Sequence, residues 1–366
     1  MRIEHLSLTN FRNYARLEAT LPADKPLVLY GSNAQGKTSL LEAVHLLGHG
    51  RSFRGRVRDG LVRHGCPALE VYAEWIDARQ QGHRAGLRHS GSTWEARLYG
   101  EAVGSLAQLC SALAVVSFDP GSHELISGGA EHRRRFLDWA LFHVEPEFLE
   151  CWRRFARGLR QRNALLKTQP GARQLDPWDD ELADAGEKLN ALRERQMTRW
   201  QPLLLDELAT SLPELGPAEL VFVPGWRRNE RSFRESLASG RERDLILGYT
   251  ASGPHRADWR IDFAGLPGRD GLSRGQTKLV ALAARLSQAS QFASARAEWP
   301  IIALDDLGSE LDREHQGRVL SRLRDTGAQV LMTGTEPPPG LTAVGLAPEV
   351  FHVEHGRVYP GIVEAK

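Results

Sequence analysis

The chain has 366 residues, of which 41% are hydrophobic and 25% are charged, and its formal net charge is +1 at pH 7. This length can hold one large domain or two to three ordinary ones, and the composition is typical of a folded globular protein. A net charge so close to zero excludes attraction to nucleic acid by the electrostatic field of the molecule as a whole. Any such affinity would have to come from local basic surfaces.

The cysteines and the beginning of the chain predict a cytoplasmic protein. Cys66, Cys110 and Cys151 are odd in number and lack C-x-x-C spacing, which favours a reducing compartment and buried thiols over a zinc site. The first residues contain no basic region that leads into a long apolar core, so we expect no signal peptide. No stretch approaches the ~18 uncharged apolar residues of a membrane-spanning helix, and we expect no membrane partner.

The first third of the chain alternates apolar and polar residues in the manner of β-strands. Residues 2–30 are predicted to form a small meander whose last strand is the apolar run 27–30. Further strands are predicted at 69–75 and 93–99. The continuous apolar run 113–118 is typical of a strand that is buried on both faces.

The middle of the chain is predicted to be helical. Residues 131–212 are rich in Arg, Leu, Ala and Glu and indicate long helices with breaks around 169–171 and 176–177. Strands and helices alternate again from about residue 245 to the end. In the second long helix an apolar face and a basic face are predicted, formed by Trp152, Phe155, Leu159 and Leu166 and by Arg153, Arg157 and Arg160. The basic face fits either a solvated helix surface or a surface that contacts DNA.

A phosphate-binding motif follows the strand predicted at 27–30. It has the pattern G-x-x-x-x-G-K-[ST] and consists of Gly31, Ser32, Asn33, Ala34, Gln35, Gly36, Lys37 and Thr38. Gly31 and Gly36 permit a turn that points successive N–H groups at a β-phosphate, and the next helix adds the positive charge of its N-terminus. Lys37 can reach the β- and γ-phosphates, and the Thr38 hydroxyl can bind Mg²⁺. We assign these residues to an ATP site and count Lys37 as catalytic as well.

An apolar strand that ends in two acids predicts the second half of this site. Residues 299–304 lead into Asp305 and Asp306, which is the Walker B arrangement. Asp305 is predicted to hold Mg²⁺ through its waters, and Asp306 to be the general base for the attacking water. The segment 329–335 occupies the switch region but offers threonine where a transporter has histidine, so we expect slow hydrolysis.

Residues 272–278 closely resemble the L-S-G-G-Q signature of ABC-type ATPases and open a predicted helix. Ser273 and Gly275 would bind the γ-phosphate at this helix N-terminus, and Gln276 is assigned to the same nucleotide. Residues 309–312 resemble the D-loop of that superfamily. In such ATPases the signature of one subunit closes over the nucleotide that the P-loop of another subunit holds. We therefore expect an ATP-dependent homodimer with two ATP molecules at its interface.

Several segments resemble the bacterial recombination mediator family RecF. They are residues 10–14, 51–54, 118–138, 253–256, 272–278 and 304–312, which together extend over almost the whole chain. The resemblance implies an α/β fold, namely an ABC-type P-loop ATPase head like those of Rad50 and SMC proteins, with a helical lobe II insertion. We expect the discontinuous ATPase domain at 1–128 and 245–366, and the lobe at 129–244.

The resemblance also implies a function. Members of this family are weak, DNA-stimulated ATPases that dimerise on DNA when ATP is bound. With RecO and RecR they promote the loading of RecA at single-strand gaps and junctions with duplex, in DNA repair, replication and the SOS response. The resemblance further implies that Arg12 contacts the nucleotide, although a solvent-exposed loop arginine would fit the sequence equally well. The basic candidates for DNA phosphates are Arg51, Arg54, Arg56, Arg58, Arg133, Arg134, Arg135, Arg153, Arg157 and Arg160.

Two other classes of protein share the ATPase motifs. A nucleotide-binding subunit of a transporter would need a membrane partner, and the long helical insert, Arg274 in the signature and the absent switch histidine argue against it. A structural chromosome-organising head would need a long coiled coil with sustained heptads. Residues 131–245 are too short and too interrupted by Pro and Gly for that.

Overall fold

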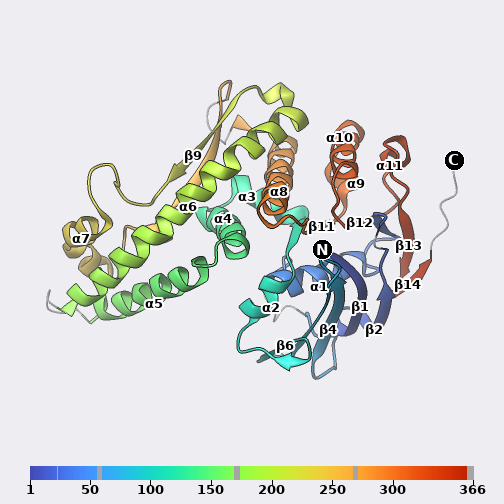
Figure 1. Cartoon of the computed structure of the whole chain (residues 1–366), viewed down its shortest axis with the longest axis horizontal. Helices are drawn as coiled ribbons and strands as arrows, with labels where there is room; N and C mark the ends of the chain where they lie inside the picture. Colours follow the sequence, from blue (N-terminus) through green and yellow to red (C-terminus); the bar gives the residue numbers. More distant parts are fainter. Residues whose placement is uncertain (23, 56–59, 169–173, 267–270, 361–366) are drawn as a thin grey trace. The chain divides into compact units, whose positions relative to one another are not determined.

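The computed structural model describes residues 1–22, 24–55, 60–168, 174–266 and 271–360. The chain forms two compact units, one from Met1–His123 and Arg274–Lys366 and the other from Glu124–Ser273 (Figure 1). The first unit is a mixture of strands and helices, whereas the second is mainly helical.

The first unit is organised around a six-stranded sheet with the order β14-β13-β3-β12-β11-β8. Its strands are β3 (Leu27–Tyr30), β8 (Val115–Phe118), β11 (Ile301–Leu304), β12 (Val330–Gly334), β13 (Glu349–Glu354) and β14 (Arg357–Pro360). All neighbours are parallel except β14, which pairs with β13 in the antiparallel sense. The inner strands are short, apolar and buried, as expected of a parallel sheet covered on both faces. Because parallel strands end at one edge, the segments that follow β3, β11 and β12 come together there.

An antiparallel sheet completes the first unit, with the order β2-β1-β4-β5-β6-β7. Its strands are β1 (Arg2–Phe11), β2 (Tyr14–Thr20), β4 (Leu69–Ile76), β5 (Gly82–His89), β6 (Trp94–Leu98) and β7 (Glu101–Ala102). The prediction of a single meander over 2–30 is wrong, because β1 and β2 pair here while β3 belongs to the parallel sheet. The difference follows from the residues, since β1 and β2 alternate apolar and polar positions and β3 is apolar throughout. The strands predicted at 69–75, 93–99 and 113–118 are confirmed as β4, β6 and β8.

Helix α1 places the phosphate-binding motif between the two sheets of the first unit. The helices of this unit are α1 (Lys37–His49), α2 (Leu106–Ala112), α8 (Arg274–Arg296), α9 (Leu307–Glu310), α10 (Arg313–Arg324) and α11 (Gly340–Ala343), with the 3-10 turn η1 (Pro120–His123). Helix α1 packs against β1 of one sheet and against β8, β11 and β12 of the other. A side chain at Gly48 would bring its Cβ within 2.7 Å of the Val115 side chain, so glycine allows the close approach of α1 to β8. Helix α1 is buried along most of its length, including Lys37, Ser39 and Leu40 of its first turn.

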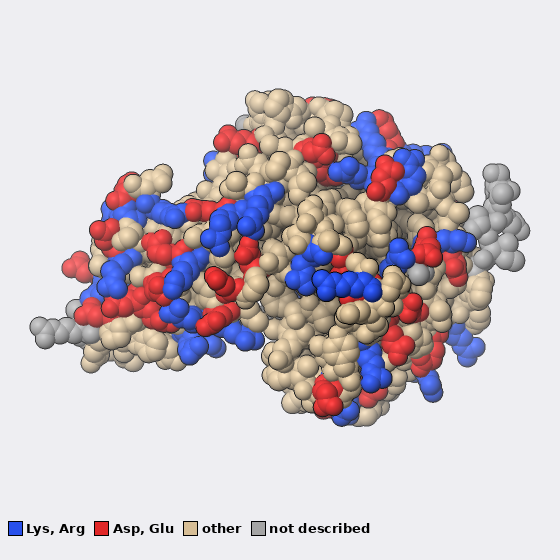
Figure 2. Space-filling view, viewed as in Figure 1, with Lys and Arg blue, Asp and Glu red and all other residues tan. Residues whose placement is uncertain are grey.

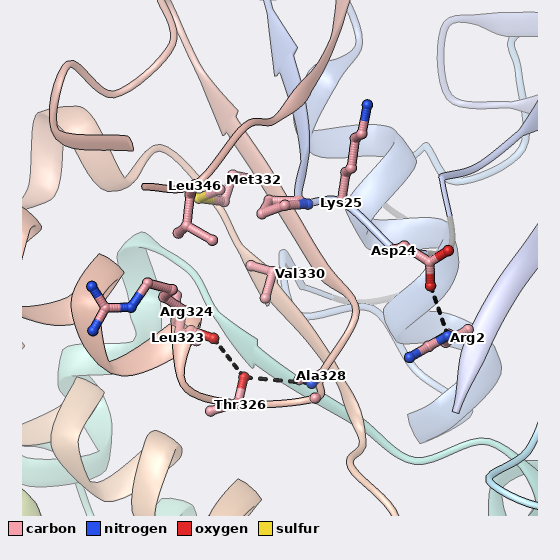
Figure 3. Close-up of a pocket in the computed structure, with 12 residues that line it drawn as sticks. Arg2, Asp24, Lys25, Leu323, Arg324, Thr326, Ala328, Val330, Met332 and Leu346 are labelled. Carbon is pink, nitrogen blue, oxygen red and sulfur yellow. Dashed lines mark hydrogen bonds and ion pairs between the residues drawn. The ribbon is translucent and has the colours of Figure 1, made fainter. Parts of the chain in front are cut away.

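A small cavity of about 160 Å³ lies where β3 and β12 begin (Figure 3). Val330 and Met332 line it, and Arg2 at its rim forms an ion pair of 2.8 Å with Asp24. The Thr326 hydroxyl donates at 2.7 Å to a carbonyl oxygen at the end of α10 and so braces the turn before β12. This cavity therefore lies at the amino ends of the parallel strands. The phosphate-binding motif lies at the opposite edge of the sheet, because it follows the carboxyl end of β3.

The second unit is built along the long helix α6 (Figure 1). Its elements are α3 (Glu124–Ser127), α4 (Ala130–Val144), α5 (Phe148–Leu166), α6 (Asp176–Ser211), η3 (Pro213–Leu215), β9 (Ala218–Val223), α7 (Phe233–Leu247), η4 (Pro254–Arg256) and β10 (Asp258–Phe263). Helices α4, α5 and α7 all pack on α6, and β9 pairs with β10. None of the helices among the described residues is long and apolar enough to cross a membrane.

The predicted helical character of residues 131–212 is confirmed by α4, α5 and α6. The break predicted around 169–171 lies outside the described residues. The break predicted around 176–177 coincides with a helix boundary, because Asp176 and Pro177 form the first turn of α6. Proline is tolerated in a first helical turn, where its missing N–H would have no intrahelical acceptor.

The compact units differ from the predicted domain boundaries at 128/129 and 244/245. The first division falls only a few residues earlier, between His123 and Glu124. The second falls between Ser273 and Arg274, so the segment 245–273 packs with the helical unit. Its strand β10 pairs with β9 and lies against α4, which accounts for this grouping. The assignment of an ATPase domain and a lobe II stays a prediction.

The segment Gly253–Arg256 shapes the core of the helical unit. Gly253 has φ +132°, and a Cβ there would lie 2.4 Å from the Phe233 ring. Phe233 is fully buried in the cluster that α5, α6 and α7 share. The Pro254 carbonyl accepts a 2.7 Å hydrogen bond from the buried Arg193 guanidinium. Glycine is therefore required here by close packing and by its positive φ.

Acid is expected to destabilise the helical unit through His255. Burial lowers the pKa of its imidazole from the ordinary 6.5 to about 4, although a hydrogen bond with the Thr250 carbonyl opposes the shift. The unfolded chain then binds more protons than the folded one between those values, so stability is lost as pH falls from 6.5 to 4, by at most about 3 kcal/mol. We expect urea unfolding followed by circular dichroism to show this decline, and His255→Gln to flatten it. An unchanged slope in that variant would assign the acid sensitivity to other groups.

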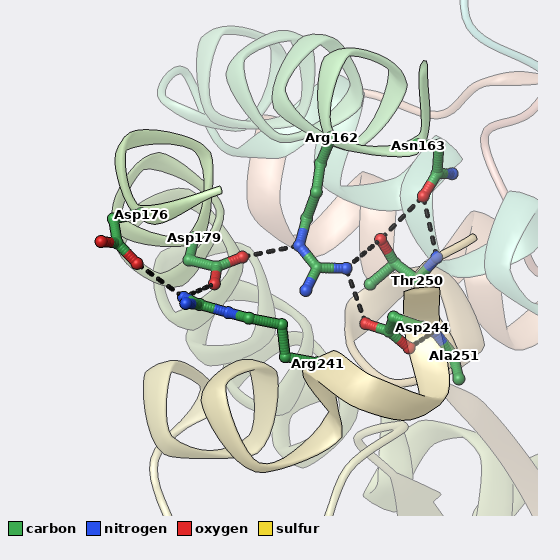
Figure 4. A network of polar contacts seen from close by, with 8 residues as sticks. All are labelled: Arg162, Asn163, Asp176, Asp179, Arg241, Asp244, Thr250 and Ala251. Carbon is green, nitrogen blue, oxygen red and sulfur yellow. Dashed lines mark hydrogen bonds and ion pairs between the residues drawn. The ribbon is translucent and has the colours of Figure 1, made fainter. Parts of the chain in front are cut away.

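A buried ionic network joins α5, α6 and α7 (Figure 4). Arg162 is fully buried and donates at 2.6 Å to Asp179 and at 2.6 Å to Asp244. Its guanidinium also donates to the Thr250 hydroxyl at 2.8 Å. Arg241 adds a second cation, at 2.5 Å from Asp179. One arginine thus neutralises carboxylates from two different helices.

Replacing Arg162 by Ala is expected to lower the free energy of unfolding by about 3–5 kcal/mol, because two buried carboxylates would lose their shared cation. The matched control is Arg160→Ala, which removes an exposed arginine from the same helix and should change stability by at most ~0.5 kcal/mol. Denaturant unfolding of both variants checks this. Equal free energies of unfolding for the two variants would show that the network makes no net contribution to stability.

Candidate functional site

The predicted phosphate-binding motif forms a glycine-cornered turn between β3 and α1. Gly31 has φ +145° and Gly36 has φ +119°, both in the region that favours glycine. A Cβ on Gly31 would lie 2.4 Å from the Val353 carbonyl oxygen. A Cβ on Gly36 would lie 2.7 Å from the side-chain amide nitrogen of Asn13. Sterics therefore require glycine at both corners.

Neighbouring segments brace this turn from outside. The Asn13 side chain donates to the Gln35 carbonyl at 2.8 Å, and the Tyr14 hydroxyl donates to the Gly36 carbonyl at 3.1 Å. The Gln35 side-chain oxygen accepts the His355 amide at 2.7 Å. Gln35 thus helps to hold the loop, while the Asn33 and Ala34 positions line the cavity described below.

Lys37 lies at the N-terminus of α1 with its ammonium folded back over the loop. It donates to the Gly31 carbonyl at 2.7 Å and to the Ser32 carbonyl at 2.8 Å. Burial lowers the pKa of this ammonium, and the nearby carboxylates of Asp306 and Asp305 oppose that shift. The side chain is therefore preorganised, and its carbonyl partners can be exchanged for phosphate oxygens.

Asp305 collects two hydroxyl groups at the end of β11. Thr38 donates to its Oδ1 at 2.8 Å, and Thr333 donates to the same oxygen at 2.6 Å. Burial raises the pKa of the Asp305 carboxyl above its ordinary value, although these two hydrogen bonds oppose the shift. Thr38 and Asp305 lie 267 positions apart in the sequence, so the parallel sheet brings the two predicted Mg²⁺ ligands into contact.

The next acid, Asp306, has an unusual backbone conformation. Its φ of +55° and ψ of +41° place a non-glycine residue in the left-handed region. Its amide N–H donates to the Thr333 hydroxyl oxygen at 2.9 Å, which fixes this conformation. Thr333 therefore joins Asp305 and Asp306 through one hydroxyl group. Sequence reasoning placed its segment in the switch region but did not assign this role.

These groups surround a cavity of about 400 Å³ at the carboxyl ends of β3, β11 and β12. The lining residues are Arg12, Asn13, Asn33, Ala34, Gly36, Lys37, Thr38, Ser39, Arg54, Gly60, Asp306 and Thr333. Arg12 is thus part of the cavity wall, with a side chain 16% exposed, and is not a solvated loop arginine. Thr38 and Asp305 offer a hydroxyl and a carboxylate, which are hard oxygen ligands of the kind that fits Mg²⁺.

The signature residues do not contribute to this cavity within one chain. Ser273, Gly275 and Gln276 are absent from its described lining. Ser273 and Gly275 are exposed next to and within the first turn of α8. Lys278, one turn further along α8, forms an ion pair of 2.6 Å with Glu310 of the predicted D-loop. The structure therefore connects the signature helix to the D-loop, while the predicted contact of the signature with nucleotide stays untested.

Comparison with known proteins decides the family. The family model described as RecF/RecN/SMC N terminal domain matches residues 2–338. A protein of Xanthomonas euvesicatoria pv. vesicatoria named DNA replication and repair protein RecF is 56% identical over 362 residues, which cover 98% of each chain. The chain belongs to the RecF family. A RecF from Vibrio campbellii is 36% identical over 98% of this chain and 100% of its own.

Solved structures agree with this RecF fold. A structure described as the recombination mediator protein RecF with ATPrS in the RecFOR pathway has a TM-score of 0.84 and 25% identity, and the match covers 98% of this chain and 97% of that one. An Smc head bound to a winged-helix domain of ScpA matches with a TM-score of 0.60 at 13% identity, over 100% and 98% of the two chains. The predicted ABC-type, SMC-like head with its helical part is therefore confirmed as a fold.

The basic residues proposed for DNA lie in different environments in this chain. Arg133 is buried, pairs with Asp258 through two hydrogen bonds of 2.6 and 3.0 Å, and donates to three backbone carbonyls. The prediction that it contacts DNA is therefore wrong, because its guanidinium is fully used inside the helical unit. Arg134 donates to the Ala257 carbonyl at 2.8 Å, and burial lowers its pKa. Arg135 is exposed and paired with Glu131.

The basic face predicted on α5 is exposed. Arg153, Arg157 and Arg160 all lie at the surface, but Trp152, assigned to the apolar face, is 42% exposed. The buried face of α5 is centred to one side of Trp152 and consists of Phe148, Cys151, Phe155, Gly158, Arg162 and Leu166. Acidic and basic residues intermingle over the visible face of the helical unit (Figure 2). This pattern leaves both the solvated and the DNA-facing interpretations of α5 open.

The loop after α1 carries the remaining basic candidates. Arg51 and Arg54 are exposed, whereas Arg56 and Arg58 lie outside the described residues. Arg54 lines the cavity that Lys37 and Thr38 form. Arg54 is therefore part of the wall of the candidate nucleotide site, which the sequence alone did not indicate.

Proposed function

We propose that this chain is an ATP-dependent DNA-binding protein of recombinational DNA repair and replication, working in the cytoplasm. The observation that supports this most is the convergence of Lys37, Thr38, Asp305 and Asp306 around one cavity at the carboxyl edge of the parallel sheet. The curated relatives are named DNA replication and repair proteins, and a solved relative of the same fold is described with a bound ATP analogue in the RecFOR pathway.

ATP would bind with its phosphates over the turn between Gly31 and Thr38. The ammonium of Lys37 would exchange its two carbonyl partners for phosphate oxygens, which form stronger, charge-assisted hydrogen bonds. Mg²⁺, when bound, would neutralise phosphate charge at the Thr38 hydroxyl and the Asp305 carboxylate. Binding at this edge agrees with the general preference of α/β sheets for ligands beyond the carboxyl ends of their strands.

Hydrolysis in this site would be slow. Asp306 lines the cavity, and its carboxylate would orient and deprotonate the attacking water. Its backbone is fixed by Thr333, a residue that cannot accept a proton as a histidine could. A slow ATPase suits a switch, in which ATP favours one assembly state and hydrolysis ends it.

That assembly state would be a homodimer. Ser273, Gly275 and Gln276 are absent from the cavity of their own chain, and Ser273 and Gly275 are exposed at the start of α8. Their most economical role is to close over the γ-phosphate of a second copy, so that two ATP molecules lie in a symmetric interface. DNA, single-stranded or as a gapped duplex, would bind the ATP dimer through exposed arginines, and RecO and RecR would then assist RecA loading in the SOS response.

Binding to gapped and intact duplex DNA, each in ATP·Mg²⁺ and in ADP·Mg²⁺ across a salt series, tests this proposal. We expect binding that prefers the gap, requires ATP and weakens steeply as salt rises, because phosphate contacts release counterions. If the chain does not bind DNA, or binds it with equal affinity in ATP·Mg²⁺ and in ADP·Mg²⁺, the DNA-repair function is contradicted. ATP binding is then measured separately.

A further inference from the structure

Glu42 of α1 is a fully buried acid beneath the wall of the nucleotide cavity. Its carboxylate receives two hydrogen bonds from the Arg12 guanidinium, 2.9 Å from Nε to Oε2 and 2.6 Å from Nη2 to Oε1. This two-point contact fixes the plane of the guanidinium as well as its position. The Arg12 side chain is only 16% exposed, and it forms part of the cavity wall.

The backbone of Arg12 supports a positional role for its side chain. Its φ of +54° lies in the left-handed region, which is unfavourable for a residue with a side chain. The strand pair at Phe11 and Tyr14 and the hydrogen bond from the Arg12 amide to the Leu61 carbonyl at 2.8 Å hold it there. Strained conformations of this kind persist where the surrounding structure imposes them, and they concentrate at binding sites.

The same carboxylate also holds the loop after α1. The Ser52 hydroxyl donates to Glu42 Oε1, and the Ser52 oxygen accepts the Arg54 amide at 2.9 Å. The Arg54 guanidinium lies 3.9 Å from Glu42 Oε2 and lines the cavity, as Arg12 does. One buried charge therefore organises two arginines on the cavity wall and the loop that carries one of them.

We propose that Glu42 is a positioning residue that fixes Arg12, and with it Arg54, to contact the phosphates of the bound nucleotide. This rests on the proposed ATP site. Two guanidinium groups on one carboxylate leave the cluster with a net positive charge next to Lys37. That charge attracts phosphate, while Glu42 keeps the two cations together in the absence of nucleotide and prevents their mutual repulsion. Arg54 thus belongs to the nucleotide site and not primarily to a DNA surface.

A double-mutant cycle on ATP affinity tests this role. Isothermal titration with ATP·Mg²⁺ is carried out on the wild-type chain, Glu42→Gln, Arg12→Gln and the double variant. Glu42→Gln keeps the size of the side chain but removes its charge, and we expect affinity to fall on the order of tenfold. In the Arg12→Gln background the same change should cost clearly less affinity, because Glu42 then acts only through the Ser52 and Arg54 contacts.

The control is Asp258→Asn, which disrupts a two-point pair with Arg133 in the helical unit. It should lower thermal stability but leave ATP affinity unchanged. Full affinity in Glu42→Gln, or an equal loss with and without Arg12, would overturn the proposal. If Glu42→Gln does not fold, the same cycle is carried out with Glu42→Asp. We expect a smaller loss of affinity from that change, which is again reduced in the Arg12→Gln background. A wild-type chain that fails to bind ATP would instead reject the proposed function.

Discussion

Replacing Lys37 by Met should reduce ATP affinity by at least about a hundredfold and abolish ATP-dependent dimerisation. The wild-type ammonium has two backbone carbonyl partners at 2.7 and 2.8 Å and lies at the N-terminus of α1, directly on the cavity. Methionine fills a similar volume but cannot offer a charge or a hydrogen bond to phosphate. Titration with a fluorescent ATP analogue measures the first effect, and sedimentation velocity in ATP·Mg²⁺ measures the second.

Lys25→Met provides the matched control for this change. Lys25 is an exposed lysine of the same compact unit, just before β3 begins, at the edge of the sheet away from the phosphate-binding motif. We expect it to bind ATP and dimerise as the wild type does. Circular dichroism should show both variants folded. ATP binding by Lys37→Met at wild-type affinity would contradict the assignment of the cavity.

Replacing Ser273 by Arg should abolish ATP-dependent dimerisation while leaving ATP binding to the single chain intact. Ser273 and Gly275 are exposed at the start of α8 and are absent from the described lining of their own chain's cavity. A long charged side chain there would therefore obstruct the surface that we propose to meet a second copy, without reaching the described lining of the cavity in its own chain. Isothermal titration with ATP and sedimentation velocity separate the two effects.

Ser294→Arg is the control on the same helix. Ser294 is exposed roughly four helical turns beyond the signature, near the end of α8. The substitution introduces the same side chain without touching the proposed interface, and we expect normal dimerisation. If Ser273→Arg also dimerised normally in ATP, the signature could not be closing over the nucleotide of a partner.

The parts of the site that are local in sequence could be predicted from the sequence. The turn from Gly31 to Thr38 needs glycine at fixed positions for steric reasons, and an apolar strand followed by Asp305 and Asp306 is recognisable by itself. Thr38 and Asp305 touch because β3, β12 and β11 are neighbours in the parallel sheet. The strand pattern of the sequence suggests this strand order but does not determine it. Family resemblance, and not spacing, supplied the expectation that Arg12 belongs to the nucleotide site.

Residues whose role depends on tertiary packing could not be predicted in the same way. Glu42 is not assigned a role from the sequence, although an acid within the mainly apolar run of α1 is a signal for a buried cation as its partner. Arg133 appeared as one of three consecutive basic residues, yet the turn of the helix directs it inward to Asp258. Trp152 lies on roughly the same side of α5 as Phe155. The face of α5 that neighbouring helices bury is centred to one side of Trp152, which therefore stays exposed.

The central claim, that two chains share each nucleotide, is tested most directly by mixing the Lys37→Met and Ser273→Arg proteins. If the signature acts on the partner's nucleotide, a mixed dimer has one doubly defective site and one intact site. We therefore predict that dimers and ATP hydrolysis, absent from each variant alone, reappear in the mixture with ATP·Mg²⁺. A mixture that stays monomeric and inactive, like its two components, would contradict a site built between two chains.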